Sequence, residues 1–146
     1  MGTFAEKILG GKAGTVVTVE PDYIVINDGV SHAAVDEITA VAAPEKVLVI
    51  YDHDVPTGRP EAAAVLRKNL KFADDYNCRY IQAEGIGYQY MLRHLVKPGQ
   101  IVIGGGSHGS IFGAVGAMGI NVSIPELARV AETGRYSLGF RVDEVA

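Results

Sequence analysis

Short apolar runs alternate with amphipathic segments along the chain, and the two patterns predict strands and helices in turn. The apolar runs are rich in Val, Ile and Tyr, which favour extended backbone. They predict strands at residues 15–19, 23–27, 46–52, 79–84, 100–104 and 135–142. The run KVLVIYD at 46–52 is apolar almost throughout, which is typical of a strand covered on both faces of a parallel sheet.

Helix signals fill most of the intervals between these runs. TFAE at residues 3–6 and Ser123 with Glu126 match a capping box, in which two polar side chains satisfy the first backbone N–H groups of a helix. Pro60 opens the longest expected helix, whose inward stripe we expect to be Ala62, Leu66, Leu70 and Ala73. The predicted helices lie near residues 3–10, 32–43, 60–77, 88–95, 110–118 and 123–134.

This order of elements predicts an α/β fold. Where strands and helices alternate, the strands pair mainly in parallel and the helices cover both faces of the sheet. We therefore expect a single domain over residues 1–146, built as a three-layer α/β/α sandwich with a mainly parallel sheet. The length of 146 residues and a hydrophobic content of 48% supply enough apolar side chains for one core.

Charge and cysteine content exclude several classes of function. Thirteen Lys and Arg against seventeen Asp and Glu give a net charge of −4, without the basic patch that nucleic-acid or membrane-surface binding requires. The single cysteine, Cys78, can form no internal disulfide, which indicates a reducing, cytoplasmic location. One thiol also cannot hold an iron–sulfur cluster or a structural zinc, so we expect no metal and no cofactor in this chain alone.

Polar side chains cluster where four of the predicted strands end. The clusters are Asn27–Asp28, Asp52–His53, Tyr88–Gln89 and Ser107–His108. Ligands of open parallel sheets collect at the carboxyl ends of the strands, so one interpretation is a shared cleft. The other is ordinary turn and helix-cap chemistry, because Asn, Asp and Ser favour those positions in any case.

The glycine-rich stretch GGGSHGSIFGAVGAMG at 104–119 contains two familiar patterns. As GxGxxG it would hold a dinucleotide, but the next predicted strand is 135–142 and its acid, Asp143, lies too far along the chain. As GxSxG it would be a nucleophile elbow, but the only histidine after Ser107 is its neighbour His108. The loop could instead offer Ser107, His108 and backbone N–H groups to an anion, or its glycines could merely let the next helix pack closely on the sheet.

Five stretches together resemble the aconitase superfamily, in particular the large subunits of isopropylmalate dehydratase and homoaconitase. The resemblance covers nearly the whole chain in order. It rests on VINDGVSH at 25–32, VLVIYDHDVP at 47–56, GIGYQYML at 85–92, KPGQIVIGGGSHGSIFGAVGAMG at 97–119 and ARVAETGRYSLGFRV at 128–142. It implies a domain like the family's iron–sulfur domain and a hydro-lyase acting on a hydroxy di- or tricarboxylic acid in amino-acid biosynthesis.

The resemblance also implies roles for particular side chains. His53 matches a general acid that protonates the departing hydroxyl group, and Asp52 matches the carboxylate that orients it. A [4Fe-4S] cluster is expected in the complete enzyme as a Lewis acid. The side chains that match ligands of the small carboxylic-acid substrate are Asn27, Gln89, Ser107 and His108.

Departures from the family pattern limit what this chain can do alone. Tyr88 stands where the family has histidine, and Gly106 stands where it has aspartate. The family's cluster cysteines and general base lie beyond the matched region, and Cys78 corresponds to none of them. We therefore expect about the first third of a large subunit, a substrate-binding lobe that acts with further domains or a partner subunit. The alternative is a free-standing, non-catalytic domain that binds a carboxylate or regulates a partner; a natural stop codon after Ala146 would favour it.

Overall fold

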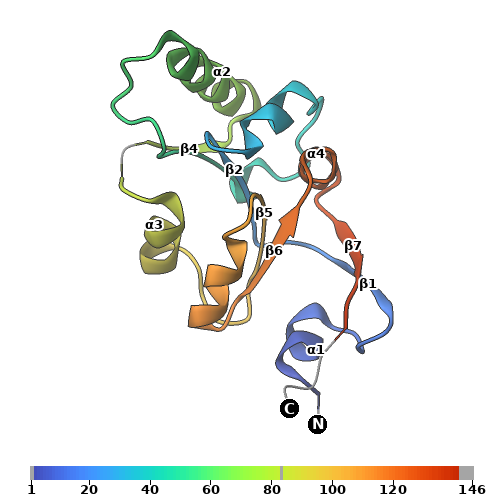
Figure 1. Cartoon of the computed structure of the whole chain (residues 1–146). Helices are drawn as coiled ribbons and strands as arrows, with labels where there is room; N and C mark the ends of the chain where they lie inside the picture. The colour runs from blue at the N-terminus through green and yellow to red at the C-terminus, as the bar shows by residue number, and fades with distance from the viewer. Residues whose placement is uncertain (1, 83, 142–146) are drawn as a thin grey trace.

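Five parallel strands form the central sheet of the computed structural model, which describes residues 2–82 and 84–141 (Figure 1). The strands are β2 (Tyr23–Asn27), β3 (Val47–Tyr51), β4 (Arg79–Gln82), β5 (Ile101–Gly105) and β6 (Met118–Val122). Their order across the sheet is β4-β3-β2-β5-β6, and each neighbouring pair is parallel. The predicted parallel sheet is thus confirmed.

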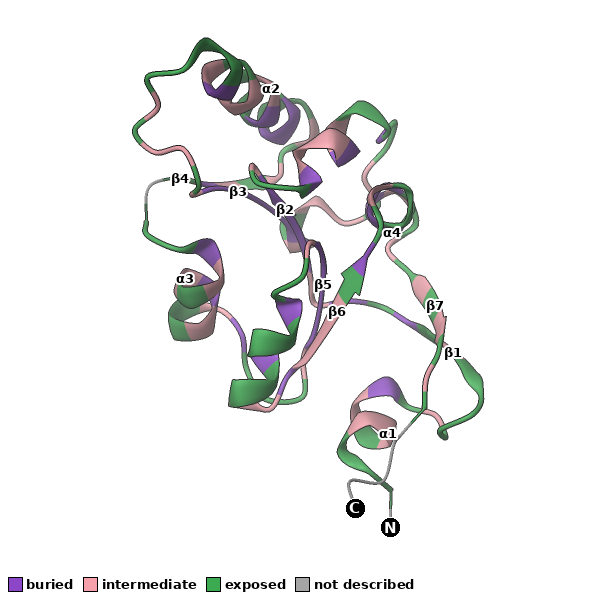
Figure 2. Ribbon diagram, viewed as in Figure 1, coloured by how far each residue is buried: buried purple, intermediate pink, exposed green. Residues whose placement is uncertain are grey.

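Helices cover both faces of this sheet, so the predicted three-layer architecture is also confirmed. Alternate residues of a strand point to opposite faces. On one face Ile24 and Ile26 pack with side chains of α2 (Pro60–Tyr76), α4 (Ile124–Thr133) and the 3-10 helix η1 (Ser31–Asp36). On the other face Val25 packs with α3 (Gly87–His94) and the 3-10 helix η3 (Gly109–Val115). Every residue of β3 and β5 is buried between these layers, as the purple strands of Figure 2 show.

A separate two-stranded sheet stands beside the main one. It consists of β1 (Val16–Val19) paired antiparallel with β7 (Tyr136–Gly139), and α1 (Phe4–Leu9) lies next to it at the lower right of Figure 1. The capping boxes predicted at Thr3 and Ser123 are both present. Residues 83 and 142, at the ends of two predicted strands, lie outside the described residues.

Two helix predictions were wrong in detail. Of the expected helix at 32–43 only residues 32–36 are helical, as part of the 3-10 helix Ser31–Asp36. The rest is tied to α4 instead: the Thr39 backbone N–H donates to the Glu132 carboxylate at 2.8 Å, and the Ala42 N–H donates to the Ala131 carbonyl at 3.0 Å. In α2 the expected inward residue Leu70 is 40% exposed, and the buried set is Ala62, Asn69, Phe72 and Ala73.

Strand β6 was missed in the sequence. It contains a glycine and an asparagine, which are uncommon in strands, and it begins where the small-residue helix expected at 110–118 would end. That helix ends at Val115, where Gly116 adopts a left-handed backbone with φ of +74°. Gly119, inside β6, is required by packing rather than by conformation. A Cβ atom there would overlap the Gly109 carbonyl oxygen of η3. The glycine therefore lets η3 lie directly on the sheet.

This close approach makes Gly119→Ala strongly destabilising. The methyl group meets backbone atoms that cannot rotate away, so we expect a loss of about 3 kcal/mol in the free energy of unfolding. Gly113→Ala is the matched control, because no atom lies within 4 Å of the added Cβ. It should leave stability unchanged or raise it by up to about 1 kcal/mol, since alanine favours helical backbone. Urea unfolding of the two variants checks this, and equal midpoints would contradict it.

No helix within the described residues is both long enough and apolar enough to cross a membrane.

Candidate functional site

A cleft of about 350 Å³ opens at the carboxyl ends of the parallel strands. It lies where β2 is flanked by β3 and β5, the point at which the order of strands reverses and ligands of open α/β sheets bind. All four strand-end clusters contribute to its wall, so of the two interpretations the structure favours the shared cleft. Its lining includes every predicted site residue: Asn27, Asp52, His53, Gln89, Ser107 and His108. The roles of these side chains stay predictions.

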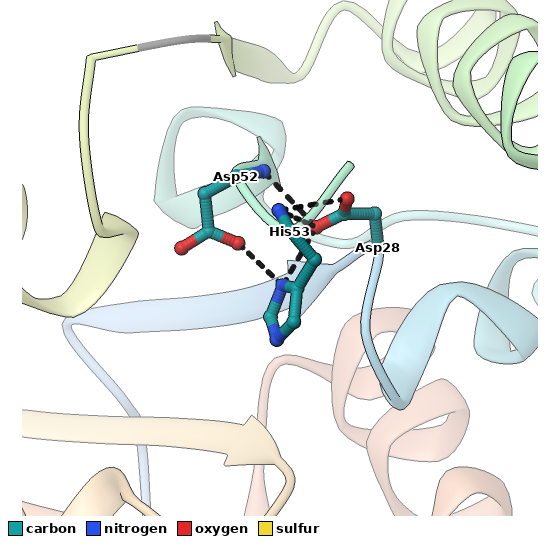
Figure 3. A group of neighbouring side chains, drawn as sticks. All are labelled: Asp28, Asp52 and His53. Atoms are coloured by element: carbon teal, nitrogen blue, oxygen red, sulfur yellow. Dashed lines mark hydrogen bonds and ion pairs between the residues drawn. The ribbon is translucent and has the colours of Figure 1, made fainter. Parts of the chain in front are cut away.

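His53 is held between two carboxylates in this cleft (Figure 3). Its Nδ1 lies 2.7 Å from Asp52 Oδ1 and 3.1 Å from Asp28 Oδ1. The imidazole is 55% exposed, whereas the Asp28 side chain is only 3% exposed. Asp28 also accepts hydrogen bonds from the backbone N–H groups of Asp52 and His53, both at 3.0 Å. One buried carboxylate therefore fixes both the turn after β3 and the ring that the turn carries.

These contacts shift the ionisation of both partners. Burial acts to raise the pKa of Asp28, but the N–H groups of Asp52 and His53 outweigh it and lower the pKa below its usual value. Burial acts to lower the pKa of His53, but hydrogen bonds and charges of Asp28 and Asp52 outweigh it and raise the pKa above its usual value. The site thus favours the protonated form of His53 beside the ionised form of Asp28.

Asp52 connects this group to the start of α3. Its Oδ2 accepts a hydrogen bond of 2.6 Å from the Gly87 backbone N–H, the first residue of that helix. A side chain at Gly87 would meet Ile50 at 2.5 Å and Asp52 Oδ2 at 3.0 Å, so glycine allows the contact. The carboxylate is therefore fixed at both oxygens.

Asn27 is buried, and its side-chain oxygen is occupied within its own turn. Oδ1 accepts hydrogen bonds from the N–H groups of Val30 at 3.1 Å and Ser31 at 3.4 Å. The Ser31 hydroxyl also donates to it at 3.2 Å. The side-chain NH₂ of Asn27 is the group that can meet a ligand.

Ser107 and His108 follow β5 and touch each other, with Oγ and Nδ1 3.2 Å apart. The two adjacent side chains are therefore within hydrogen-bonding distance. Within the described residues no carboxylate orients His108, however, so a hydrolytic triad is incomplete. The dinucleotide argument also needs correction, because the strand that follows the loop is β6. It ends at Val122 and provides no acid for a ribose.

Tyr88 and Gly106, the two departures from the family pattern, lie against each other. The Tyr88 hydroxyl is buried without a hydrogen-bond partner and lies 3.8 Å from where a Cβ of Gly106 would be. Gly106 has a φ of +127°, a conformation that disfavours other residues. Phe112 fixes the tyrosine ring by an edge contact at 5.5 Å. Burial, and then the charge of Asp52, raise the pKa of Tyr88 above its usual value, so its hydroxyl stays neutral.

The described residues contain one group of three side chains close enough to hold a metal ion, namely Asp28, Asp52 and His53. Hydrogen bonds within the group account for its short distances, and we assign no metal site. A [4Fe-4S] cluster does not fit this chain. Cys78 packs on the α2 face, away from the residues that line the cleft, and burial raises its thiol pKa to about 11.

Sequence reasoning missed two features of the cleft. Asp28 was noted as a neighbour of Asn27, but nothing in the sequence reveals that its carboxylate turns toward His53. The second feature is an apolar rim, formed by the exposed side chains of Val30, Ile86 and Ile111. Only the position of these residues beside the polar clusters could have indicated it.

The His53 contacts predict a pH-dependent contribution to stability. A raised pKa for His53 stabilises the fold below the ordinary value of 6.5 and ceases to do so as pH rises through the folded value. A lowered pKa for Asp28 stabilises the fold above 3.8 and fails as pH falls further. His53→Ala should therefore cost more stability near ~pH 5 than near ~pH 9 in urea unfolding. His94→Ala, outside the cleft, is the control; an equal loss at both pH values would contradict the assignment.

Comparison with known proteins supplies relatives but no matching family model. The chain is 33% identical to 3-isopropylmalate dehydratase large subunit 2 of Methanopyrus kandleri, over 88% of this chain and 35% of that protein. It is 30% identical to the homoaconitase large subunit of Thermus thermophilus, over 91% and 35%. It is 34% identical to the probable 3-isopropylmalate dehydratase large subunit of Methanothermobacter thermautotrophicus, over 97% and 37%. The chain thus spans about a third of the length of the curated relatives it matches.

Proposed function

We propose that this chain, whose curated homologues are aconitase-superfamily large subunits, forms a substrate-binding lobe of a hydro-lyase. The reaction is the dehydration or hydration of a hydroxy di- or tricarboxylic acid of the isopropylmalate or citrate type. The observation that carries the proposal is the cleft itself. The ends of β2, β3 and β5 and the first turn of α3 bring together the six side chains that the family resemblance marks for catalysis and substrate binding.

Proton transfer to the departing hydroxyl group is the part that His53 would perform. Asp28 and Asp52 occupy its Nδ1, which leaves Nε2 as the atom able to give a proton to substrate. The raised pKa of His53 enlarges the fraction of its acid form at a given pH, and Asp52 Oδ1 lies 2.7 Å from the ring to accept its Nδ1–H. The Ser107 hydroxyl, the Asn27 amide and the Gln89 amide, together with His108, would bind the carboxylates of the substrate.

The cleft supports a lobe rather than a complete active site. Its described lining contains no lysine or arginine, so the charge of a polycarboxylate needs further cationic groups from elsewhere. The exposed rim of Val30, Ile86 and Ile111 is an apolar surface suited to burial against another part of the enzyme. The relatives are named large subunits, and a small subunit is the partner that such a name implies.

The [4Fe-4S] cluster implied by the family would act as Lewis acid on the hydroxyl group in the complete enzyme. Cys78 is the chain's single cysteine and lies away from the cleft, so the ligands of a cluster must come from other regions or a partner. The family's general base would come from there as well.

A second candidate function is a non-catalytic carboxylate-binding or regulatory domain. Tyr88 and Gly106 favour it, because they replace together a histidine–aspartate pair that the family keeps. The neutral, buried Tyr88 hydroxyl cannot exchange a proton readily near neutral pH.

Anaerobic purification of the native protein from its source distinguishes the two functions. We expect the 146-residue sequence in a longer polypeptide or a stable complex, with hydro-lyase activity and cluster absorbance near ~400 nm. Intact mass and an assay of the unsaturated acid are the measurements. A free polypeptide of 15.5 kDa that binds carboxylates without turnover would support the second function and overturn the first.

A further inference from the structure

We propose that Asp28 and Gly29, adjacent at the end of β2, are the positioning residues of His53. Asp28 holds the Nδ1 side of the imidazole, and Gly29 leaves the space in which the opposite edge of the ring lies. The inference rests on the proposed function only in that His53 is taken as the proton donor. The structural part of the proposal is that Asp28 and Gly29, which follow β2, fix the orientation of the His53 side chain, which follows β3.

The carboxylate and the backbone N–H of Asp28 both have hydrogen-bond partners. Its carboxylate accepts the backbone N–H groups of Asp52 and His53 at 3.0 Å and that of Asp54 at 3.4 Å. Its Oδ1 also lies 3.1 Å from the imidazole Nδ1 (Figure 3). The Asp28 backbone N–H donates to the Ile50 carbonyl at 3.1 Å, which continues the pairing of β2 with β3. The position of the Asp28 carboxylate is therefore fixed by the backbone pairing of the sheet.

Gly29 supplies the other half of the arrangement. A Cβ atom at this position would lie 2.5 Å from His53 Nε2 and 2.7 Å from Cε1, so the ring rests where any side chain would be. Gly29 is not among the residues with positive φ. Alanine is therefore not strained there by a positive φ, and the three atoms nearest to its methyl group all belong to the His53 ring. This separates the positioning effect from backbone strain.

The arrangement dictates which nitrogen carries the proton. Two carboxylate oxygens face Nδ1, so the neutral ring keeps its hydrogen there and presents a lone pair at Nε2. On protonation the second hydrogen is added at Nε2. The other titratable side chains that line the cleft are Tyr88 on α3 and His108 after β5, and neither hydrogen-bonds to the His53 ring.

Imidazole NMR of the ¹⁵N-labelled chain tests the proposal. The wild type should show the Nδ1–H tautomer when neutral and a His53 titration above 6.5. Gly29→Ala should displace the ring, mix the tautomers and bring the titration back toward 6.5. Gly58→Ala is the matched control, since no atom lies within 4 Å of its added Cβ. An unchanged tautomer and titration in Gly29→Ala would overturn the role of Gly29.

A second pair of variants tests Asp28. Asp28→Asn should weaken the Nδ1–H preference and bring the His53 titration back toward 6.5, with the Asp52 oxygen left as the charged acceptor at Nδ1. Asp54→Asn should leave both unchanged, because Asp54 pairs with Arg59 and does not touch the ring. Amide spectra report whether each variant is folded. If folded Asp28→Asn keeps the wild-type tautomer and titration, the proposal fails. These readouts require no turnover, so they can fail while hydro-lyase activity is found, or succeed while it is absent.

Discussion

Replacing His53 with alanine in the complete enzyme should lower kcat by about 10²-fold or more. Among the described residues of the cleft, the His53 imidazole is both held by two carboxylates and biased toward its acid form. Its proton would move to the departing hydroxyl only in the transition state. The loss should therefore fall on kcat and kcat/KM alike, with little change in KM.

The control for this variant is His94→Ala, which removes an exposed histidine at the end of α3 that does not line the cleft. It should retain wild-type turnover. Initial-rate measurements over a range of substrate concentrations separate kcat from KM for both variants. An unchanged kcat in His53→Ala would remove this residue from the mechanism.

Four of the five strands of the main sheet were predictable because their signals are local. Apolar runs such as residues 46–52 mark buried parallel strands, and polar residues directly after several such strands must meet at one edge. The resemblance to the aconitase superfamily was likewise predictable from short ordered motifs, and the curated relatives confirm it.

Features that depend on contacts distant in sequence were not predictable. The pairing of β1 with β7 joins residues at opposite ends of the chain, and nothing in either strand specifies the partner. The sequence predicts a helix around Thr39, but the backbone N–H and hydroxyl of Thr39 donate hydrogen bonds to Glu132 on α4 instead. Gly119 weakens the strand pattern of β6, although it is there because η3 crosses it. In each case a tertiary contact overrides the local preference.

The same limit applies within the candidate site. Motifs identified His53 but not the residues that aim it, since Asp28 approaches it from a different strand. The sequence shows that Tyr88 and Gly106 stand in place of the family's histidine and aspartate. It does not show how the two positions lie relative to each other. The structure adds that the two positions are close: the Tyr88 hydroxyl lies 3.8 Å from where a Cβ of Gly106 would be, and a side chain at residue 106 would be strained by its φ of +127°.

Binding of a hydroxy-polycarboxylate to the chain is the second large effect that we expect. The hydroxyl and amide donors of the cleft, together with the protonated His53 imidazole, should bind citrate or isopropylmalate weakly in the isolated chain, because the described lining has no lysine or arginine to add. Acetate should not bind detectably. Removing one hydrogen bond to a carboxylate costs about 1.5–3 kcal/mol, so Ser107→Ala should weaken binding by about 10-fold or more. Ser110→Ala, in η3 and outside the cleft lining, is the matched control and should bind as the wild type does.

Titration of the ¹⁵N-labelled chain with citrate and isopropylmalate, followed by amide NMR at constant ionic strength, tests directly whether the cleft is a carboxylate site. We expect saturable shifts confined to Asn27, His53, Gln89, Ser107 and His108, with weaker binding in Ser107→Ala. Shifts that are absent, that are scattered over the surface, or that are identical in Ser107→Ala and Ser110→Ala would contradict it.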